Sequence, residues 1–216
     1  MLYIDPKLDN YILEHISPEG EILEELTRQT NLKTVHPQMN SGHLQGKILE
    51  IISKIMRPHR ILEIGTFTGY SAISLAKGLD HGGKLFSIDI SDELYDMAIS
   101  YIEKAGMKDK ITLITGNALE VMKEMDEYFD LVFMDGEKRE YSDYYDIVIN
   151  MLKPGGVILA DNVLWSGKVI DSDSSQDPST LGILAFNKKV REDDRVECII
   201  LPVRDGISVI RKKWMV

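Results

Sequence analysis

Residues 60–71 read Arg-Ile-Leu-Glu-Ile-Gly-Thr-Phe-Thr-Gly-Tyr-Ser, and this stretch decides the fold. The apolar run from Ile61 to Ile64 is typical of a buried parallel strand. Gly65 and Gly69 mark a turn, and a helix is expected to begin at Tyr70. Such a succession forms a ligand-binding corner, because glycine allows close approach and the free N–H groups at the helix start point toward the ligand.

The ligand at this corner differs from a dinucleotide. The dinucleotide fingerprint is G-x-G-x-x-G, whereas this chain has Glu63-x-Gly65-x-x-x-Gly69, with Phe67 in place of the second glycine. An acidic residue ahead of Gly65 repels a pyrophosphate but suits an ammonium group. The pattern therefore favours a nucleoside with a cationic tail, such as S-adenosylmethionine (SAM), over the alternative of a nicotinamide-dependent oxidoreductase.

A second acidic residue supports a nucleoside ligand. Asp89 ends the apolar run 84–89, and nucleotide-binding α/β folds carry a ribose-binding acid about 20 residues after the glycine turn. We expect Asp89 to accept hydrogen bonds from both ribose hydroxyls. The alternative is a helix cap before the helix predicted over 92–105, a role that Ser91 would fill equally well.

Strands and helices alternate regularly from residue 60 onward. This alternation predicts an α/β fold with a Rossmann-like, seven-stranded, mostly parallel sheet and helices on both faces. Two final apolar runs, 196–201 and 207–211, predict an antiparallel hairpin that completes the sheet. The other strands are expected at 60–64, 84–89, 111–115, 130–134 and 156–160, and the helices of this region at 70–78, 92–105, 118–126, 141–151 and 178–192.

Residues 1–57 have helical patterns and are interpreted as an N-terminal cover or dimer contact. The predicted helices run over 5–16, from about 17 to 30, and over 41–56. Together with an α/β core at 60–216 they are expected to form one domain spanning 1–216.

The composition narrows the classes of partner. The chain has 216 residues and a formal net charge of −10, which argues against a strongly basic nucleic-acid surface. Its single cysteine, Cys198, excludes an internal disulfide, agrees with a cytoplasmic location, and lies in an apolar run that predicts burial. No stretch is long enough to cross a bilayer.

Acidic and amide side chains follow the fourth and fifth predicted strands. Asp135 follows the fourth, and Asp161 and Asn162 follow the fifth. Ligands in open α/β sheets bind at the carboxyl ends of strands, and hard oxygen donors suit Mg²⁺. The alternative is that all three are turn and cap residues. Beside a cation, Lys138 would have a lowered pKa and could act as a base, while Trp165 would either wall an aromatic substrate or anchor its loop.

Several ordered motifs resemble the metal- and SAM-dependent O-methyltransferases of the catechol and caffeoyl-coenzyme A type, including their small bacterial members. The resemblance covers nearly everything from Met39 onward. The motifs are Met-Asn-Ser-Gly at 39–42, Leu-Glu-Ile-Gly at 62–65, Gly-Tyr-Ser-Ala at 69–72, the segment 130–138 that is similar to the family's DxxDxxK pattern, and Pro-Gly-Gly at 154–156 leading to Asp-Asn-Val-Leu-Trp at 161–165.

The resemblance implies a role for each matching residue. Asp135, Asp161 and Asn162 would bind the metal, Lys138 would be the base, and Asp135 would also lie near the methionine end of SAM. Two positions depart from the family: Asn117 stands where an aspartate is common, and Ile199 stands where animal catechol enzymes carry a substrate-binding glutamate. The cofactor-contacting positions implied are Ser41, Glu63, Gly65, Ser71, Asp89, Asn117, Ala118 and Asp135.

The resemblance therefore implies a SAM- and Mg²⁺-dependent enzyme that methylates a hydroxyl of a small catechol-like acceptor. One alternative is the same chemistry on a tRNA 5-hydroxyuridine. Others are the nicotinamide-dependent oxidoreductase and a SAM-binding module without catalysis, which the complete metal trio disfavours. The family often forms homodimers, and we expect a homodimer that uses part of Met1–Thr30.

Overall fold

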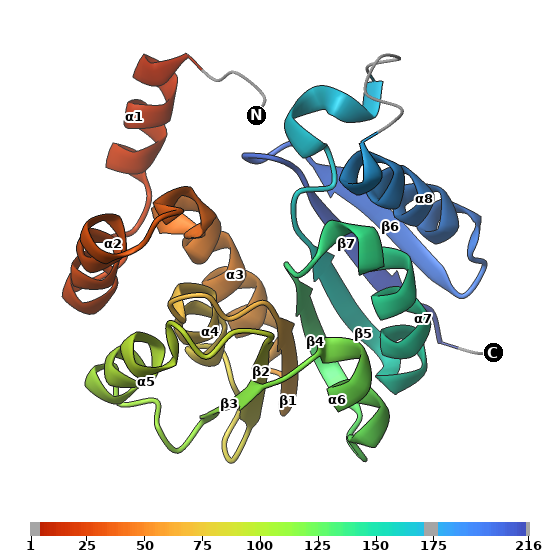
Figure 1. Ribbon diagram of the computed structural model, residues 1–216, viewed down its shortest axis with the longest axis horizontal. Helices are drawn as coiled ribbons and strands as arrows, with labels where there is room; N and C mark the ends of the chain where they lie inside the picture. The colour runs from red at the N-terminus through yellow and green to blue at the C-terminus, as the bar shows by residue number, and fades with distance from the viewer. Residues whose placement is uncertain (1–4, 171–176, 215–216) are drawn as a thin grey trace. The chain divides into compact units, whose positions relative to one another are not determined.

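The computed structural model describes residues 5–170 and 177–214. Within these residues, seven strands form one mixed sheet in the order β3-β2-β1-β4-β5-β7-β6 (Figure 1). β2 and β3 are parallel, as are β4 and β5, whereas β7 is antiparallel to both β5 and β6. The predicted α/β sheet with an antiparallel C-terminal pair is confirmed. The strands are β1 (Arg60–Ile64), β2 (Lys84–Asp89), β3 (Ile111–Thr115), β4 (Phe129–Met134), β5 (Leu152–Ala160), β6 (Val196–Leu201) and β7 (Ile207–Lys212).

The helices also follow the predicted pattern, with shifts of three or more residues at three element starts. The helix expected from about 17 to 30 is found at Glu21–Lys33. The helix expected from residue 92 begins only at Tyr95, because Ser91 Oγ accepts a hydrogen bond from Glu93 N and holds a turn there. The fifth strand begins at Leu152 rather than at residue 156, and its pairing with β4 shifts register across the Pro-Gly-Gly segment, where Gly155 has a φ of +80°. The helices are α1 (Pro6–His15), α2 (Glu21–Lys33), α3 (Gly42–Met56), α4 (Tyr70–Ala76), α5 (Tyr95–Lys104), α6 (Ala118–Glu124), α7 (Tyr141–Met151) and α8 (Pro178–Glu192), with 3-10 turns η1 (Pro37–Met39), η2 (Lys138–Glu140) and η3 (Trp165–Ile170).

Contacts between Cα atoms divide the chain into two units. The N-terminal unit contains the described residues from Asp5 to Ile61 together with Thr66–Thr115. The C-terminal unit contains Leu62–Gly65 together with the residues from Gly116 onward. The division falls inside β1 rather than at residue 57, so the expected boundary between helical cover and α/β core remains a prediction.

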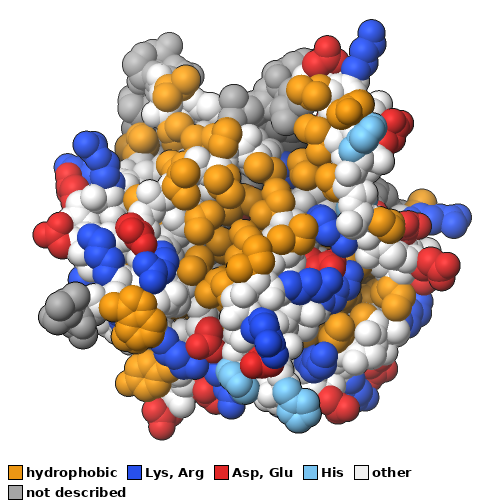
Figure 2. Space-filling model, turned by 180° about the vertical axis from the view of Figure 1, so that it is seen from behind, with side chains coloured by type: hydrophobic (Ala, Val, Ile, Leu, Met, Phe, Trp, Pro, Cys, Tyr) orange, Lys and Arg blue, Asp and Glu red, His pale blue; other side chains and the backbone are white. Residues whose placement is uncertain are grey.

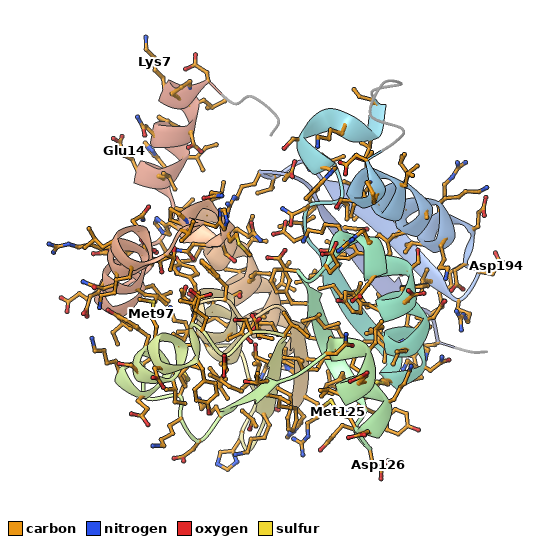
Figure 3. All side chains as sticks on the ribbon, in the orientation of Figure 1. Lys7, Glu14, Met97, Met125, Asp126 and Asp194 are labelled. Atoms are coloured by element: carbon orange, nitrogen blue, oxygen red, sulfur yellow. The ribbon has the colours of Figure 1, made fainter. Side chains whose placement is uncertain are left out.

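The N-terminal unit is built around α3 and α4. Every residue of α4 is buried, and Ser53 Oγ of α3 donates a hydrogen bond to Leu75 O of α4 at 2.6 Å. α2 buries Leu23 and Leu26, but α1 buries no residue. Lys7 and Glu14 project outward from α1 (Figure 3). α1 therefore contributes little to the core of this unit.

The C-terminal unit has its core between β4, β5 and the helices α7 and α8. The segment Leu131–Met134 is completely buried, as is Ile158–Ala160. Tyr145 of α7 packs edge-on against Phe186 of α8, with ring centroids 6.0 Å apart. Strands that are buried on both faces are continuous apolar runs, which is why their positions were predictable.

The predicted burial of Cys198 is wrong. Cys198 lies on β6, the last strand of the sheet order, and its side chain is exposed. Its neighbour Ile199 is 60% exposed. An edge strand lacks a partner on one side, so an apolar run there does not imply burial. In the described part of the chain, no helix combines the length and the apolar character needed to span a membrane.

Candidate active site

The turn after β1 begins at Gly65, whose φ of +97° lies in the left-handed region. A Cβ atom at this position would lie 2.4 Å from the carbonyl oxygen of Asp135. Asp135 N in turn donates a hydrogen bond to Ile64 O at 2.8 Å. The close approach of two backbones therefore requires this glycine. Contact between Gly65 and a cofactor remains a prediction.

Three further residues predicted to contact the cofactor are buried. Glu63 of β1 has no exposed surface. In the N-terminal unit, Ser41 precedes α3 and is 7% exposed, and Ser71 lies in the first turn of α4 and is 6% exposed. Burying a carboxylate costs free energy unless charges or hydrogen-bond donors compensate it. Glu63 therefore stands out as the polar residue of an otherwise apolar stretch of strand.

Asp89 holds the glycine turn in place. Its Oδ2 accepts hydrogen bonds from Thr66 N at 3.0 Å and Phe67 N at 2.9 Å. Its Oδ1 accepts one from Ser91 N at 3.0 Å. Asp89 is thus not the cap of α5, which has Leu94 at its cap position. A carboxylate offers about four lone-pair sites. By this count the three amides leave about one for a ribose hydroxyl rather than the expected two.

Asn117 caps the helix that begins with Ala118. Its Oδ1 accepts hydrogen bonds from Leu119 N at 2.9 Å and from Glu120 N at 3.3 Å. The asparagine therefore keeps the capping function that an aspartate would have. With Oδ1 engaged, the side-chain NH₂ is the group that remains for a nucleobase, and this group donates where an aspartate would accept.

Asp135 and Asp161 meet at the carboxyl edge of the C-terminal unit. β4 and β5 are paired so that Met134 lies opposite Ala160, and the two aspartates follow these residues. Asp161 N donates to Met134 O at 2.9 Å, which extends the pairing by one residue. Asp161 is 4% exposed, and its Oδ1 accepts from Asn162 N at 2.8 Å. The structure therefore places the three predicted metal ligands at the ends of two neighbouring strands, whereas their binding of one ion remains a prediction.

The chemistry of these donors fits a hard divalent cation. Two carboxylates and one amide oxygen are ligands that Mg²⁺ accepts, with further positions left for water or substrate. Among residues 5–170 and 177–214, no group of three or more His, Cys, Asp or Glu side chains is disposed to hold a metal. The candidate set depends on Asn162, whose φ of +58° is left-handed.

The buried Lys138 forms an ion pair with the half-buried Asp135. Its Nζ lies 2.7 Å from Asp135 Oδ1 and 2.9 Å from the hydroxyl of Tyr141, and the residue is 9% exposed. Burial alone would lower the pKa of Lys138, but the Asp135 carboxylate and the Tyr141 hydroxyl together raise it above its ordinary value. This pKa shift is opposite to the one expected beside a cation, and the role of Lys138 as a base remains a prediction.

Two residues that sequence reasoning missed support Lys138. Burial raises the pKa of Tyr141, so its hydroxyl stays protonated and can donate. Gly182 of α8 packs directly on η2, because a Cβ there would lie 2.4 Å from Lys138 O. The only signal in the sequence was the position of Tyr141 three residues after Lys138, which reads equally well as the start of a core helix.

Trp165 is tied to the start of α8. Its Nε1 donates to Asp177 Oδ2 at 3.3 Å, and Lys168 Nζ lies 3.1 Å from the same oxygen. This arrangement agrees with the prediction that Trp165 anchors its loop, whereas contact with a substrate remains a prediction. Asp171 and Asp173, which follow Trp165 in the sequence, lie outside the described residues.

Comparison with known proteins gives a consistent result. The model of the O-methyltransferase family matches residues 13–213. A caffeoyl-CoA O-methyltransferase from Eucalyptus gunnii is 34% identical over 95% of this chain and 87% of its own length. Tricin synthase 2 from Oryza sativa subsp. japonica is 32% identical over 90% of this chain and 70% of its own length.

Two solved O-methyltransferase structures share the fold of this chain, and they hold SAH and SAM, respectively. An O-methyltransferase from Bacillus cereus in complex with SAH has a TM-score of 0.88 and 32% identity, covering 96% of this chain and 97% of that one. The O-methyltransferase TomG from Streptomyces achromogenes in complex with SAM has a TM-score of 0.89 and 28% identity, covering 96% of both chains. The chain therefore belongs to the O-methyltransferase family and is a SAM-dependent O-methyltransferase.

Proposed function

We propose that this enzyme transfers the methyl group of SAM to a hydroxyl of a small catechol-like acceptor and that it requires Mg²⁺. The observation that carries the metal requirement is the meeting of Asp135, Asp161 and Asn162 at one strand edge. A cation held there supplies positive charge that favours the phenolate form of the acceptor, which otherwise has a pKa of about 10.

In this proposal each polar side chain near the ends of β4 and β5 has its own role. Asp161 and Asn162 serve the metal, and Asp135 shares one carboxylate oxygen with Lys138. Lys138 holds positive charge beside the acceptor oxygen. Before it can accept the hydroxyl proton, its ammonium must lose its own, and the ion pair with Asp135 opposes that loss. Lys138 is still our candidate base, and Trp165 our candidate substrate wall.

In the same proposal, Asp89 binds the ribose of SAM, and Glu63 faces the cationic end. Ser41, Gly65, Ser71, Asn117 and Ala118 complete the cofactor contacts. Holding the methyl donor and acceptor in line supplies much of the rate acceleration in a reaction of this kind.

Charge supports a small acceptor over the tRNA alternative. A polyanion binder gathers Lys and Arg on one surface, whereas this chain has 25 basic and 35 acidic residues. On the face drawn in Figure 2, basic and acidic side chains are interspersed. The relatives named above act, by their names, on caffeoyl-CoA or in tricin synthesis. These names favour a phenolic acceptor for this chain too.

The test compares two acceptors under the same conditions. Labelled SAM and Mg²⁺ are supplied with either a simple catechol or tRNA that lacks the methyl group. We expect methylation of the catechol and negligible labelling of the tRNA. Efficient, salt-sensitive methylation of the tRNA with no turnover of the catechol would reverse this assignment.

We also propose a homodimer that uses part of Met1–Thr30, of which residues 1–4 lie outside the described residues. The support is α1, which buries none of its residues and leaves Leu8 52% and Tyr11 57% exposed. A helix with an uncovered apolar side is stabilised when a second surface covers it.

A further inference from the structure

Tyr141 joins the parts of the chain that carry the candidate metal ligands. It is the first residue of α7, and its side chain has no exposed surface. Its hydroxyl accepts a hydrogen bond from Lys138 Nζ at 2.9 Å and lies 3.1 Å from both Met134 O and Asp161 O. A hydroxyl has one proton, which is therefore shared between the two carbonyl oxygens.

These two carbonyls lie where the regular strand pairing ends. Met134 is the last residue of β4 and precedes Asp135, and Asp161 directly follows β5. Asp135 N and Asp161 N still donate hydrogen bonds to Ile64 O and Met134 O. The hydroxyl of Tyr141 therefore bridges the two ligand-bearing segments where the regular pairing of β4 with β5 ends, and it also accepts a hydrogen bond from Lys138.

Packing fixes the position of this hydroxyl. The ring of Tyr141 meets the ring of Phe186 edge-on, with centroids 5.4 Å apart and planes at 83°. A buried ring in such an arrangement has little freedom to move. Because the side chain is completely buried, it cannot touch a substrate, so any influence on catalysis must act through its neighbours.

We propose that Tyr141 is a positioning residue for the metal site, whose hydroxyl fixes the spacing of Asp135 and Asp161 and so sets the affinity for a divalent cation. This inference rests on the proposed metal requirement. Groups that orient metal ligands without touching the metal commonly change its affinity by about 10- to 100-fold when removed. Tyr141→Phe removes only the hydroxyl and keeps the ring against Phe186.

The chain offers a matched control in Tyr145. This residue also lies on α7, is also completely buried, and also meets Phe186 edge-on, at 6.0 Å and 77°. Its hydroxyl, however, donates to Asp193 Oδ2 at 2.8 Å, at the far end of α8. Tyr145→Phe therefore removes a buried hydroxyl from the same helix, at a place away from the strand ends that carry Asp135 and Asp161.

The experiment is a Mn²⁺ titration followed by the electron paramagnetic resonance signal of the free ion, without substrate. Wild type, Tyr141→Phe, Tyr145→Phe and Asp161→Ala are compared, and the stoichiometry of SAM binding counts the folded protein in each sample. We expect the Kd for Mn²⁺ to rise about tenfold or more in Tyr141→Phe. It should stay at the wild-type value in Tyr145→Phe. The Mg²⁺ concentration for half-maximal turnover should rise in parallel, with the KM for SAM unchanged.

The outcomes separate this inference from the proposal on which it rests. Equal Kd values for wild type and both phenylalanine variants, together with lost binding in Asp161→Ala, would overturn the role of Tyr141 and keep the metal site. Equal loss in Tyr141→Phe and Tyr145→Phe would also overturn it, because a general packing effect would then explain the change. Unaltered binding in Asp161→Ala would overturn the metal site itself and the role of Tyr141 with it.

Discussion

Replacing Asp89 with alanine is expected to weaken both the fold and the binding of SAM. The carboxylate accepts hydrogen bonds from Thr66 N, Phe67 N and Ser91 N, at 3.0, 2.9 and 3.0 Å. Asp89 is half-buried, so water can reach the freed amides, and each bond is worth about 1 kcal/mol net. The loss of all three costs about 3 kcal/mol, or roughly 6–12 °C in Tm for a chain of this size.

The substitution is also expected to weaken the binding of SAM, independently of its effect on the free energy of unfolding. One ribose hydroxyl donating to a charged acceptor contributes about 1.5–3 kcal/mol, so the Kd should rise by about one to two orders of magnitude. Calorimetry with SAM measures the Kd, and a thermal melt without SAM measures the stability. Asp80→Ala is the control, because Asp80 pairs with Arg57 at 2.7 Å in the same unit and does not contact the turn.

One result would refute this reasoning. If Asp89→Ala melts at a lower temperature but binds SAM with the wild-type Kd, the carboxylate serves only the turn and the ribose is bound elsewhere. If Asp80→Ala weakens SAM as much as Asp89→Ala does, the effect is one of general charge.

Three further predictions concern acid stability, helix packing and assembly. Burial alone would raise the pKa of Glu50, but Lys54, Lys47 and Lys77 hold it at about 2, below its ordinary value of 4.5. Because the folded pKa is depressed, this stabilisation is present above about pH 4.5 and is lost as the pH falls toward 2. Glu50→Gln should thus cost up to about 3 kcal/mol in urea unfolding at pH 7 and less than half as much at pH 3, whereas equal costs at both would contradict it. Gly182→Ala should push α8 away from Lys138 O, lower kcat and leave the Kd for SAM unchanged; kinetics and calorimetry showing a wild-type kcat would contradict this packing. Light scattering should give twice the monomer mass of 24.5 kDa at micromolar concentration, and the monomer mass would argue against the dimer.

The sequence predicted the strands better than the helix starts, for a physical reason. The strands at 60–64, 84–89 and 111–115 match their predicted bounds. For β1 the reason is a continuous buried apolar run, whereas β3 begins the sheet order and buries only Ile111. The start of α5 was placed too early, because Ser91 bonds to the backbone and delays the helix. Cys198 was misjudged because an apolar run does not reveal that its strand lies at the edge of a sheet.

The candidate metal ligands were predictable from the sequence, but the residues that hold their neighbours in place, Tyr141 and Gly182, were not. Asp135, Asp161 and Asn162 stand directly after apolar runs, so their place at a strand edge follows from the pattern. The hydroxyl of Tyr141 contacts Met134 and Asp161, which lie 7 and 20 residues away in the chain. Gly182 approaches Lys138 across a still longer separation in the chain. Contacts of this kind depend on how α7 and α8 pack, and no local pattern encodes them.

The central claim is that methyl transfer needs a divalent cation held by Asp135, Asp161 and Asn162. The most direct test measures the initial rate of labelled methyl transfer from SAM to a catechol, with and without chelator, and the Kd for SAM by calorimetry. We predict that chelator abolishes turnover, that added Mg²⁺ restores it, and that Asp161→Ala is inactive at every Mg²⁺ concentration while it binds SAM with the wild-type Kd. An undiminished rate in excess chelator, or a fully active Asp161→Ala variant, would contradict the claim.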